Sequence, residues 1–314
     1  MIYIGIDVGG MSIKAGAVNE KGVILCKDTC PTGVERGYEA MIRDIAQLGI
    51  SVAEKSGHTM ADVKAIGIGI PGIMDQRTGI VPFCTNLAWH DVPILAEMKK
   101  YTDVPVYVDN DATVAGLAES VAGVSAGCKD SVFITLGTGV GGGVVMNGRV
   151  FSGAHGVATE IGHMTVVDGG EPCTCGKRGC WERYASATAL IREGHRLCEA
   201  KPDCALMKAV GGDIEQVTAK HVIDLAKDGD PDCAKLFDNY VHYLVIGLSN
   251  MINLYDPEMF VLGGGVSHAG SFLLDAVRAK LPEYVFFKAM PYARVELARL
   301  SNDAGIIGAA MLGR

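Results

Sequence analysis

Two patterns of apolar and polar positions alternate along the first third of the chain. Short apolar runs are typical of buried strands, and they lie at residues 2–8, 12–18, 23–27, 63–70 and 104–108. Polar residues 19–22 separate two of these runs and predict a hairpin. Apolar residues recur every three or four positions over 38–55, which predicts a helix, and a second helix is expected from Asp111 to about Ala122.

The same order of elements then starts again. A strand is expected at 131–136, a glycine-rich loop follows at 137–143, and the chain turns back over 143–150. Later helices are expected at 186–199, 218–227, 231–253 and 304–311, and a last strand at 259–262. The repeat predicts an α/β fold with two related lobes, at 1–112 and 113–303, with residues 304–314 packed on the first lobe.

Composition and charge narrow the class of protein. The chain has 314 residues, of which 49% are apolar, so each lobe can have its own core. A net charge of −8 argues against binding to nucleic acid or to an anionic membrane. We find neither the pattern of a secretory signal nor an apolar run of membrane-spanning length. Ten cysteines without such a signal predict a reducing, cytoplasmic location.

Four residues with soft ligand atoms fall within 18 positions: His163, Cys173, Cys175 and Cys180. Three thiolates and one imidazole fill a tetrahedral zinc shell and leave no open position, so we expect a structural metal. A disulfide is the alternative, but it leaves one of the three cysteines unpaired. Glu160 and Glu182 flank the cluster. We therefore expect the segment 160–182 to be an insertion in the second lobe that shapes a binding surface.

Glycine-rich turns follow three of the expected strands, at Gly9-Gly10, Gly137-Thr138-Gly139 and Gly263-Gly264-Gly265. Without a Cβ, the backbone N–H groups of such turns can approach a phosphate closely. Each turn alone could be a plain connection, and none has the spacing of a P-loop or of a Rossmann fingerprint. Together, at the ends of buried strands, they predict a nucleotide-binding cradle.

Carboxylates also stand at strand ends. Asp7 can hold Mg²⁺ directly or through water, although a turn-capping role is equally consistent with its position. Asp111 follows Asn110 where a strand meets a helix, and an Asp there can be an N-cap. Phosphoryl transfer to a hydroxyl needs a carboxylate that accepts the hydroxyl proton. We take Asp111 as the candidate base and Asp109 as the second candidate.

These motifs resemble the ROK sugar kinases, within the actin/hexokinase-like (ribonuclease H-like) ATPase superfold, over nearly the whole chain. The motifs that carry the resemblance include 7–10, Pro71-Gly72, 108–112, 136–143, 160–163, 173–182 and 263–266. The zinc segment is the most specific of them. Residues 85–93 are most similar to the glucokinase branch, although relatives that act on other hexoses share the remainder.

The resemblance implies an ATP- and Mg²⁺-dependent kinase that phosphorylates the 6-hydroxyl of a hexose, with glucose the foremost substrate and Asp111 the base. It implies a sugar pocket lined by Gly72, Asn86, Asn110, Asp111, Glu160, His163 and Glu182. It implies an ATP site made by Asp7, Gly9, Gly10, Ser12, Lys14, Gly137, Thr138, Gly139, Gly263, Gly264 and Gly265. It further implies a homodimer or a dimer of dimers. One ring nitrogen of His163 would bind zinc while the other faces the sugar.

One position departs from the family pattern. Met11 stands where the first phosphate turn usually continues with Thr or Ser, and a thioether cannot donate a hydrogen bond. Ser12 or backbone N–H groups would then contact the phosphate. Three alternatives stay open: another hexose as substrate (mannose, fructose, allose or N-acetylmannosamine), polyphosphate as donor, or a sugar sensor without phosphoryl transfer. The ROK repressors carry a helix-turn-helix before this domain, and with the first expected strand at Ile2 we expect no DNA binding.

Overall fold

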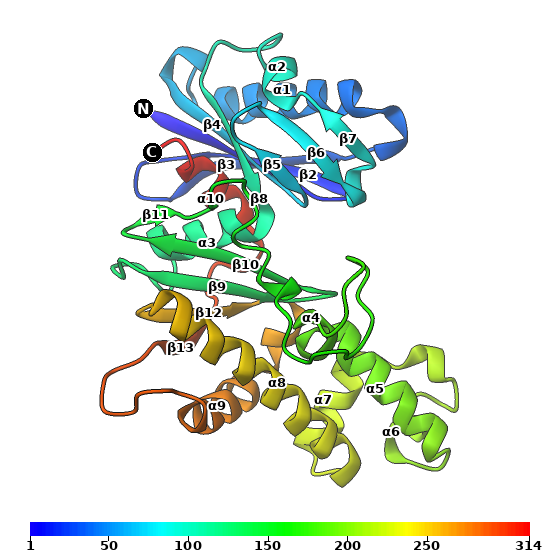
Figure 1. Cartoon of the computed structure of the whole chain (residues 1–314). Coiled ribbons are helices and arrows are strands. Elements are labelled where there is room, and N and C mark those ends of the chain that lie inside the picture. The colour runs from blue at the N-terminus through cyan, green and yellow to red at the C-terminus, as the bar shows by residue number, and fades with distance from the viewer. The chain divides into compact units, whose positions relative to one another are not determined.

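The chain forms two compact α/β units. The computed structural model describes all 314 residues (Figure 1). Unit 1 comprises residues 1–133, 143–159 and 298–314, and unit 2 comprises 134–142 and 160–297. The division passes within strands β9 (Ser131–Leu136) and β10 (Val140–Met146). Each unit is described by itself.

A five-stranded sheet in the order β3-β2-β1-β4-β8 forms the centre of unit 1. Its strands are β1 (Ile2–Val8), β2 (Ser12–Val18), β3 (Ile24–Pro31), β4 (Val63–Ile70) and β8 (Val106–Asn110). The first three strands pair antiparallel, whereas β1, β4 and β8 run parallel. The carboxyl ends of these three parallel strands therefore meet at one edge of the sheet.

Helices cover both faces of this sheet. Ile4 and Ile6 meet the helix α1 (Tyr38–Lys55) in the main core, and Figure 1 shows α1 lying along the sheet. Successive strand residues point to opposite faces, so Gly5 faces the other side. There the helix α10 (Ala304–Met311) packs so closely that a Cβ on Gly5 would overlap the carbonyl oxygen of Ile306.

The helix α3 (Asp111–Ala122) belongs wholly to unit 1, so the compact unit continues past the expected boundary at residue 112. Its apolar face packs against α10: Leu117 and Ala118 share one core cluster with Ile306 and Ile307. The sequence predicted that the C-terminal helix packs on the first lobe. In the structure, α10 contacts β1 and β4 as well as α3.

A small three-stranded sheet in unit 1 was not predicted. It is formed by β5 (Ile73–Asp75), β6 (Ile80–Cys84) and β7 (Trp89–Val92), and the short helix α2 (Ile94–Met98) follows it. Its strands have three to five residues, too few for a clear alternation of apolar and polar positions. A turn of 3-10 helix, η3 (Thr85–Leu87), joins β6 to β7.

The second five-stranded sheet repeats the order of the first. Its order is β11-β10-β9-β12-β13, with β11 at Arg149–Val150, β12 at Met259–Gly263 and β13 at Arg294–Leu297. Strands β12 and β13 are parallel, as are β4 and β8 at the corresponding places. This confirms the two related halves expected from the repeated strand, glycine loop and hairpin. The strand β13 was not predicted.

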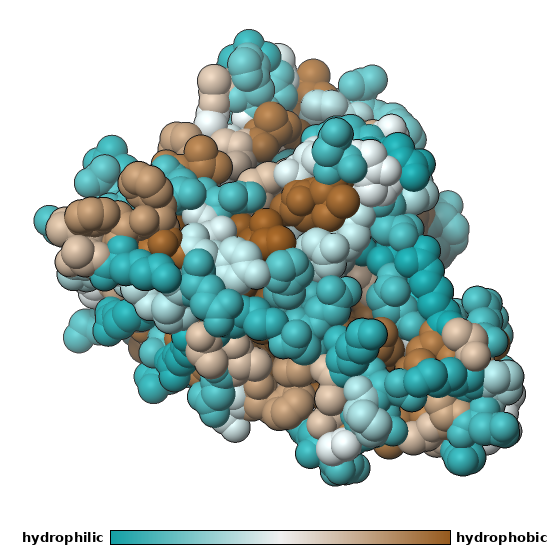
Figure 2. Space-filling model, turned by 60° about the horizontal axis from the view of Figure 1, so that its bottom comes forward, coloured by the Kyte–Doolittle hydropathy of each residue, from teal (hydrophilic) through white to brown (hydrophobic).

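Helices make up much of unit 2. They are α4 (Glu182–Ala185), α5 (Ala187–Ala200), α6 (Ala205–Ala209), α7 (Ala219–Lys227), α8 (Pro231–Tyr255) and α9 (Ser271–Lys280). Side chains of Ser186, Thr218 and Asp230 cap α5, α7 and α8, which explains where these helices begin. No helix combines the length and apolar character needed to span a membrane. On the face drawn in Figure 2, apolar residues lie in separate patches among hydrophilic ones.

Candidate functional site

Three predicted site segments follow neighbouring parallel strands of unit 1. In the ladder Asp7 pairs with Gly69, and Gly69 pairs in turn with Asp109. Asp7 is near the end of β1, Gly72 follows β4, and Asn110 ends β8. Residues distant in sequence are thus brought to one edge of one sheet.

Asn110 organises the start of helix α3. Its Oδ1 accepts hydrogen bonds from the backbone N–H groups of Ala112, at 2.9 Å, and Thr113, at 3.4 Å. Its Nδ2 donates to the carbonyl oxygen of Gly72 at 3.2 Å. Asn110 is therefore the N-cap and also ties α3 to the end of β4. Asp111 is the first residue of α3, and its Oδ1 accepts a hydrogen bond from Ala112 N at 2.7 Å.

Asp109 is held differently from Asp111. Only 9% of Asp109 is exposed, and its two carboxylate oxygens accept hydrogen bonds from Asn110 N, at 2.8 Å, and from Ser152 Oγ, at 3.1 Å. Burial raises the pKa of this carboxyl, against the opposing effect of the two hydrogen bonds. Asp109 thus anchors the segment that carries Ser152, which leaves Asp111 as the better-placed candidate base.

The first glycine turn lies beside a predicted sugar residue. A Cβ on Gly10 would be 3.6 Å from the carbonyl oxygen of Asn86. The turn is closed by Gly9 N, which donates to Ser12 O at 3.0 Å, and by Thr32 Oγ1, which donates to Gly9 O at 2.6 Å. Met11 is 90% exposed, so its thioether takes no part in closing the turn. The fully buried Thr32 holds the turn and was missed by sequence reasoning.

Asp7 lies under the first turn of helix α10. A Cβ on Gly305 would meet the Asp7 carboxyl carbon at 2.5 Å, so glycine is needed there for this approach. Burial raises the pKa of Asp7, and the positive charge of Lys14, whose Nζ is 4.0 Å from the carboxylate, opposes that rise. A partly buried carboxylate at a strand end has the chemistry of a Mg²⁺ ligand.

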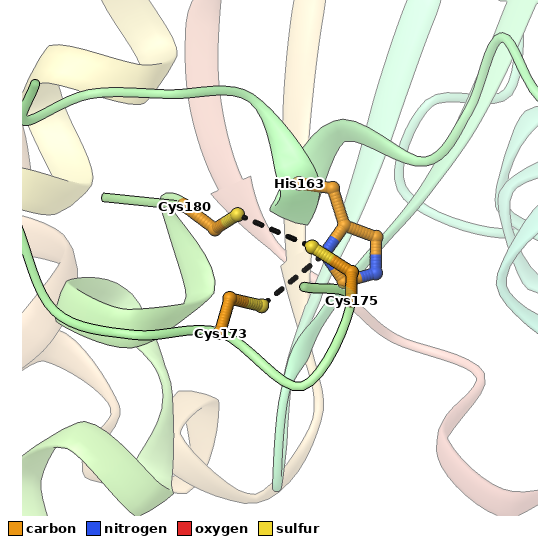
Figure 3. Close-up of side chains that lie close together, drawn as sticks. All are labelled: His163, Cys173, Cys175 and Cys180. Carbon is orange, nitrogen blue, oxygen red and sulfur yellow. Dashed lines mark hydrogen bonds between the residues drawn. The ribbon is translucent and has the colours of Figure 1, made fainter. Parts of the chain in front are cut away.

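The four predicted zinc ligands come together in unit 2. Their ligand atoms all lie within 4.8 Å of one another. Figure 3 shows the three sulfur atoms and one ring nitrogen of His163 pointing toward a common centre. The Sγ atoms of Cys175 and Cys180 are 3.6 Å apart, and Cys173 Sγ is 3.7 Å from His163 Nδ1. A tetrahedral zinc with bonds of about 2.0–2.3 Å needs ligand separations of about 3.5–3.8 Å, and these two separations match that range.

Backbone hydrogen bonds shape the cysteine loop around this centre. Gly176 N donates to Cys173 O at 3.0 Å, and both Gly176 (φ 87°) and Gly179 (φ 77°) adopt the left-handed conformation that favours glycine. Burial raises the pKa of the Cys173 thiol to about 12, whereas the backbone N–H of Lys177 lowers the pKa of Cys175. All ten cysteines are free thiols.

Glutamates lie on two sides of His163. Its Nδ1 faces the cysteines and lies 3.9 Å from Glu182 Oε1, whereas its Nε2 lies 3.9 Å from Glu160 Oε2. Glu182 Oε1 also accepts a hydrogen bond from Cys173 Sγ at 3.0 Å. A Cβ on Gly139 would be 2.6 Å from Glu182 Oε2. Glu182 therefore connects the cysteine cluster to the second glycine turn.

The second and third glycine turns are neighbours in unit 2. A Cβ on Gly264 (φ 81°) would be 2.6 Å from Leu136 N, just before the second turn. Ala187 N and Thr188 Oγ1, at the start of α5, donate to the carbonyl oxygens of Gly137 and Thr138, at 2.8 and 2.7 Å. A cavity of about 430 Å³ adjoins the third turn and is lined by residues of α5, α7 and the 3-10 helix η6 (Gly265–Ala269), among them Ile191, Ile223, Val266 and His268.

Comparison with known proteins places this arrangement in a family. A sequence model of the ROK family matches residues 3–314. The chain belongs to the ROK family. Among ROK proteins, it is 38% identical to a glucokinase of Halalkalibacterium halodurans, over 99% of this chain and 94% of that one. It is also 38% identical to a glucokinase of Thermotoga maritima, over 98% and 96% of the two chains.

A solved ROK structure extends the likeness to three dimensions. The ROK family glucokinase of Streptomyces griseus, crystallised with glucose and AMPPNP, is 36% identical, with a TM-score of 0.80 over 99% of both chains. The expected family and fold are thereby confirmed. The cavity beside η6 was not predicted from the sequence, because its lining comes from elements far apart in the chain.

Proposed function

We propose that this protein is an ATP-dependent hexose kinase that converts glucose to glucose 6-phosphate. The observation that carries the proposal is the match, over nearly the full length of both chains, to a ROK glucokinase that binds glucose and an ATP analogue. Two further relatives, each 38% identical, bear the same activity in their names.

Asp111 is the proposed base. Its carboxylate accepts the proton of the sugar 6-hydroxyl while the hydroxyl oxygen bonds to the γ-phosphorus, and ADP leaves with the electrons of the broken P–O bond. The position of Asp111 beside the N-cap Asn110, and the anchoring of Asp109 by Ser152, support this choice over Asp109. We assign to hexose binding the residues Gly72, Asn86, Asn110, Asp111, Glu160, His163 and Glu182.

We assign the cavity beside η6 to the adenosine part of ATP. Apolar side chains such as Ile191, Ile223 and Val266 suit a base, and the adjoining turn at Gly263–Gly265 suits phosphate. The other proposed ATP residues are Asp7, Gly9, Gly10, Ser12, Lys14, Gly137, Thr138 and Gly139. Asp7 would hold Mg²⁺, which neutralises the charge that develops on the phosphates when it is bound.

Zinc is the proposed structural metal. His163, Cys173, Cys175 and Cys180 supply four ligands and leave no open position, so the metal would order the loop and not take part in the reaction. With Nδ1 toward the metal, the His163 Nε2–H would be free to face a sugar hydroxyl. The homodimer or dimer of dimers stays a prediction, which light scattering of the purified protein tests. The cytoplasmic location also stays a prediction.

The test is a coupled assay for ADP with one ATP concentration and a panel of sugars. We expect turnover with glucose to exceed turnover with mannose, fructose, allose, glucosamine and N-acetylmannosamine. Glucose binding without ADP release would favour the sugar sensor instead. Repeating the assay with polyphosphate in place of ATP tests the donor, and turnover that depends on polyphosphate alone would contradict the assignment of ATP.

A further inference from the structure

Cys84 lies at the centre of the proposed hexose residues of unit 1. It ends β6, is 1% exposed, and is the N-cap of η3, the turn that carries Asn86. Its Sγ–H donates a hydrogen bond to the carbonyl oxygen of Pro71 at 3.2 Å. The thiol thus joins the turn at Pro71-Gly72, after β4, to the turn that carries Asn86.

The contact continues from the thiol to the start of helix α3. A Cβ on Gly72 would lie 2.8 Å from Cys84 Cβ and 3.1 Å from its Sγ, so the backbone at Gly72 rests on this side chain. The carbonyl oxygen of Gly72 accepts the hydrogen bond from Asn110 Nδ2 at 3.2 Å. Asn110 in turn caps the helix whose first residue is Asp111.

We propose that Cys84 is a positioning residue of the hexose site. Its thiol fixes the Pro71-Gly72 turn, and through Gly72 and Asn110 it fixes the place of the base Asp111. This inference rests on the function proposed above and adds a residue that none of the glycine or acidic motifs contains.

Cysteine suits this position for two reasons. The Cys84 side chain belongs to the main apolar core of unit 1, beside Leu87 and Trp89, where a small polarisable group packs well. The same group is a weak hydrogen-bond donor, so it can satisfy the Pro71 carbonyl with a smaller desolvation cost than a hydroxyl. An apolar residue of the same size would keep the packing but leave this carbonyl without its donor.

The experiment compares Cys84→Ala, Cys84→Val and Cys84→Ser with the wild-type chain. Ala and Val remove the donor; Ala leaves the space of the sulfur empty, whereas Val fills that space and adds one further methyl group. We expect both to raise the KM for glucose about three- to tenfold, the effect of one lost hydrogen bond, and to weaken glucose binding in calorimetry by a similar factor. The KM for ATP should stay within about twofold of the wild-type value. Ser keeps a donor and should restore most of the glucose affinity.

Cys30→Ala is the matched control, because Cys30 packs against the same core and none of the hydrogen bonds of the hexose residues involves it. It should leave both KM values unchanged. A wild-type glucose KM in both Cys84→Ala and Cys84→Val would overturn the inference, as would equal changes in the KM for glucose and ATP. If Cys84→Ala does not fold, the glucose KM of Cys84→Val tests the inference. If the wild-type chain phosphorylates no hexose, that result would instead contradict the proposed function.

Discussion

At the scale of single residues, two aspartates that are two positions apart have different surroundings. Asp109 is buried and accepts hydrogen bonds from Ser152 and from a backbone N–H group, whereas Asp111 is the first residue of helix α3. Sequence reasoning ranked Asp111 first because a strand-end Asp next to an Asn suits a general base. The burial of Asp109 could not be predicted from the sequence, because it depends on the segment around Ser152, which is distant in sequence and packs against the end of β8.

The first prediction separates these two carboxylates. Asp111→Asn should lower kcat by a factor of about 10²–10⁴, since the 6-hydroxyl loses its proton acceptor, and should spare most of the glucose binding. The matched variant Asp109→Asn keeps an oxygen acceptor for Asn110 N and should change kcat by less than about threefold. Steady-state kinetics and calorimetry measure both. Loss of activity in Asp109→Asn alone would reverse the assignment.

The second prediction concerns pH. Burial raises the pKa of Asp109 in the folded protein above its ordinary value of 3.8. Its contribution to stability is therefore greatest below pH 3.8 and is lost as the pH rises through the raised folded value. In urea unfolding at a series of pH values, Asp109→Asn should lose this part of the pH dependence. An unchanged profile in the variant would show that Asp109 does not titrate in this way.

At the scale of elements, strand ends and helix starts position the site. Asp7, Gly72 and Asn110 meet because β1, β4 and β8 are parallel neighbours, and the start of α5 holds the turn at Gly137–Gly139. The long elements were predicted closely, as in α1 at Tyr38–Lys55, because their apolar periodicity extends over several turns. The small sheet β5-β6-β7 was missed, although Asn86 and Cys84 depend on it.

The third prediction tests the third glycine turn. Gly264 has a φ of 81°, and a Cβ there would lie 2.6 Å from Leu136 N, so Gly264→Ala should lower the free energy of unfolding by at least about 1 kcal/mol. It should also raise the KM for ATP more than the KM for glucose. The control is Gly265→Ala, because no atom lies within 4 Å of a Cβ at Gly265. Equal effects of the two variants on stability would contradict the geometric argument.

At the scale of the whole molecule, one topology is used twice. In both sheets two antiparallel strands lie beside the central strand, and two further strands follow on its other side. The segment 160–182 is an addition to this plan, and much of it follows backbone turns without long helices or strands. Trp181, near the end of this segment, donates a hydrogen bond from its Nε1 to the carbonyl oxygen of Tyr243 in α8, at 2.8 Å. Because this segment has few of the hydrogen bonds of helices and strands, a bound metal would hold it in one conformation.

The fourth prediction is that removal of the metal acts mainly on unit 2. Purified protein should contain about one zinc per chain. A strong chelator should lower the Tm and increase hydrogen exchange over 160–182 and the adjoining part of α8, because the loop loses its bonds to the metal. Exchange in β1 and β4 of unit 1 should change little. Exchange that is uniform across both units, or protein that contains no zinc, would count against the structural role.

The sequence by itself determined the elements with long periodic patterns, the repeat of two halves, and the candidate metal cluster of His163, Cys173, Cys175 and Cys180, whose ligand atoms the structure brings together. These follow from local spacing, because apolar periodicity and close-set ligands need few distant contacts to be recognised. Only the tertiary structure decided that Asp109 is buried, that Glu182 joins the cysteine cluster to Gly139, and that Cys84 supports Gly72. Each of these depends on contacts between segments far apart in the chain, which leave no periodic signal in the sequence.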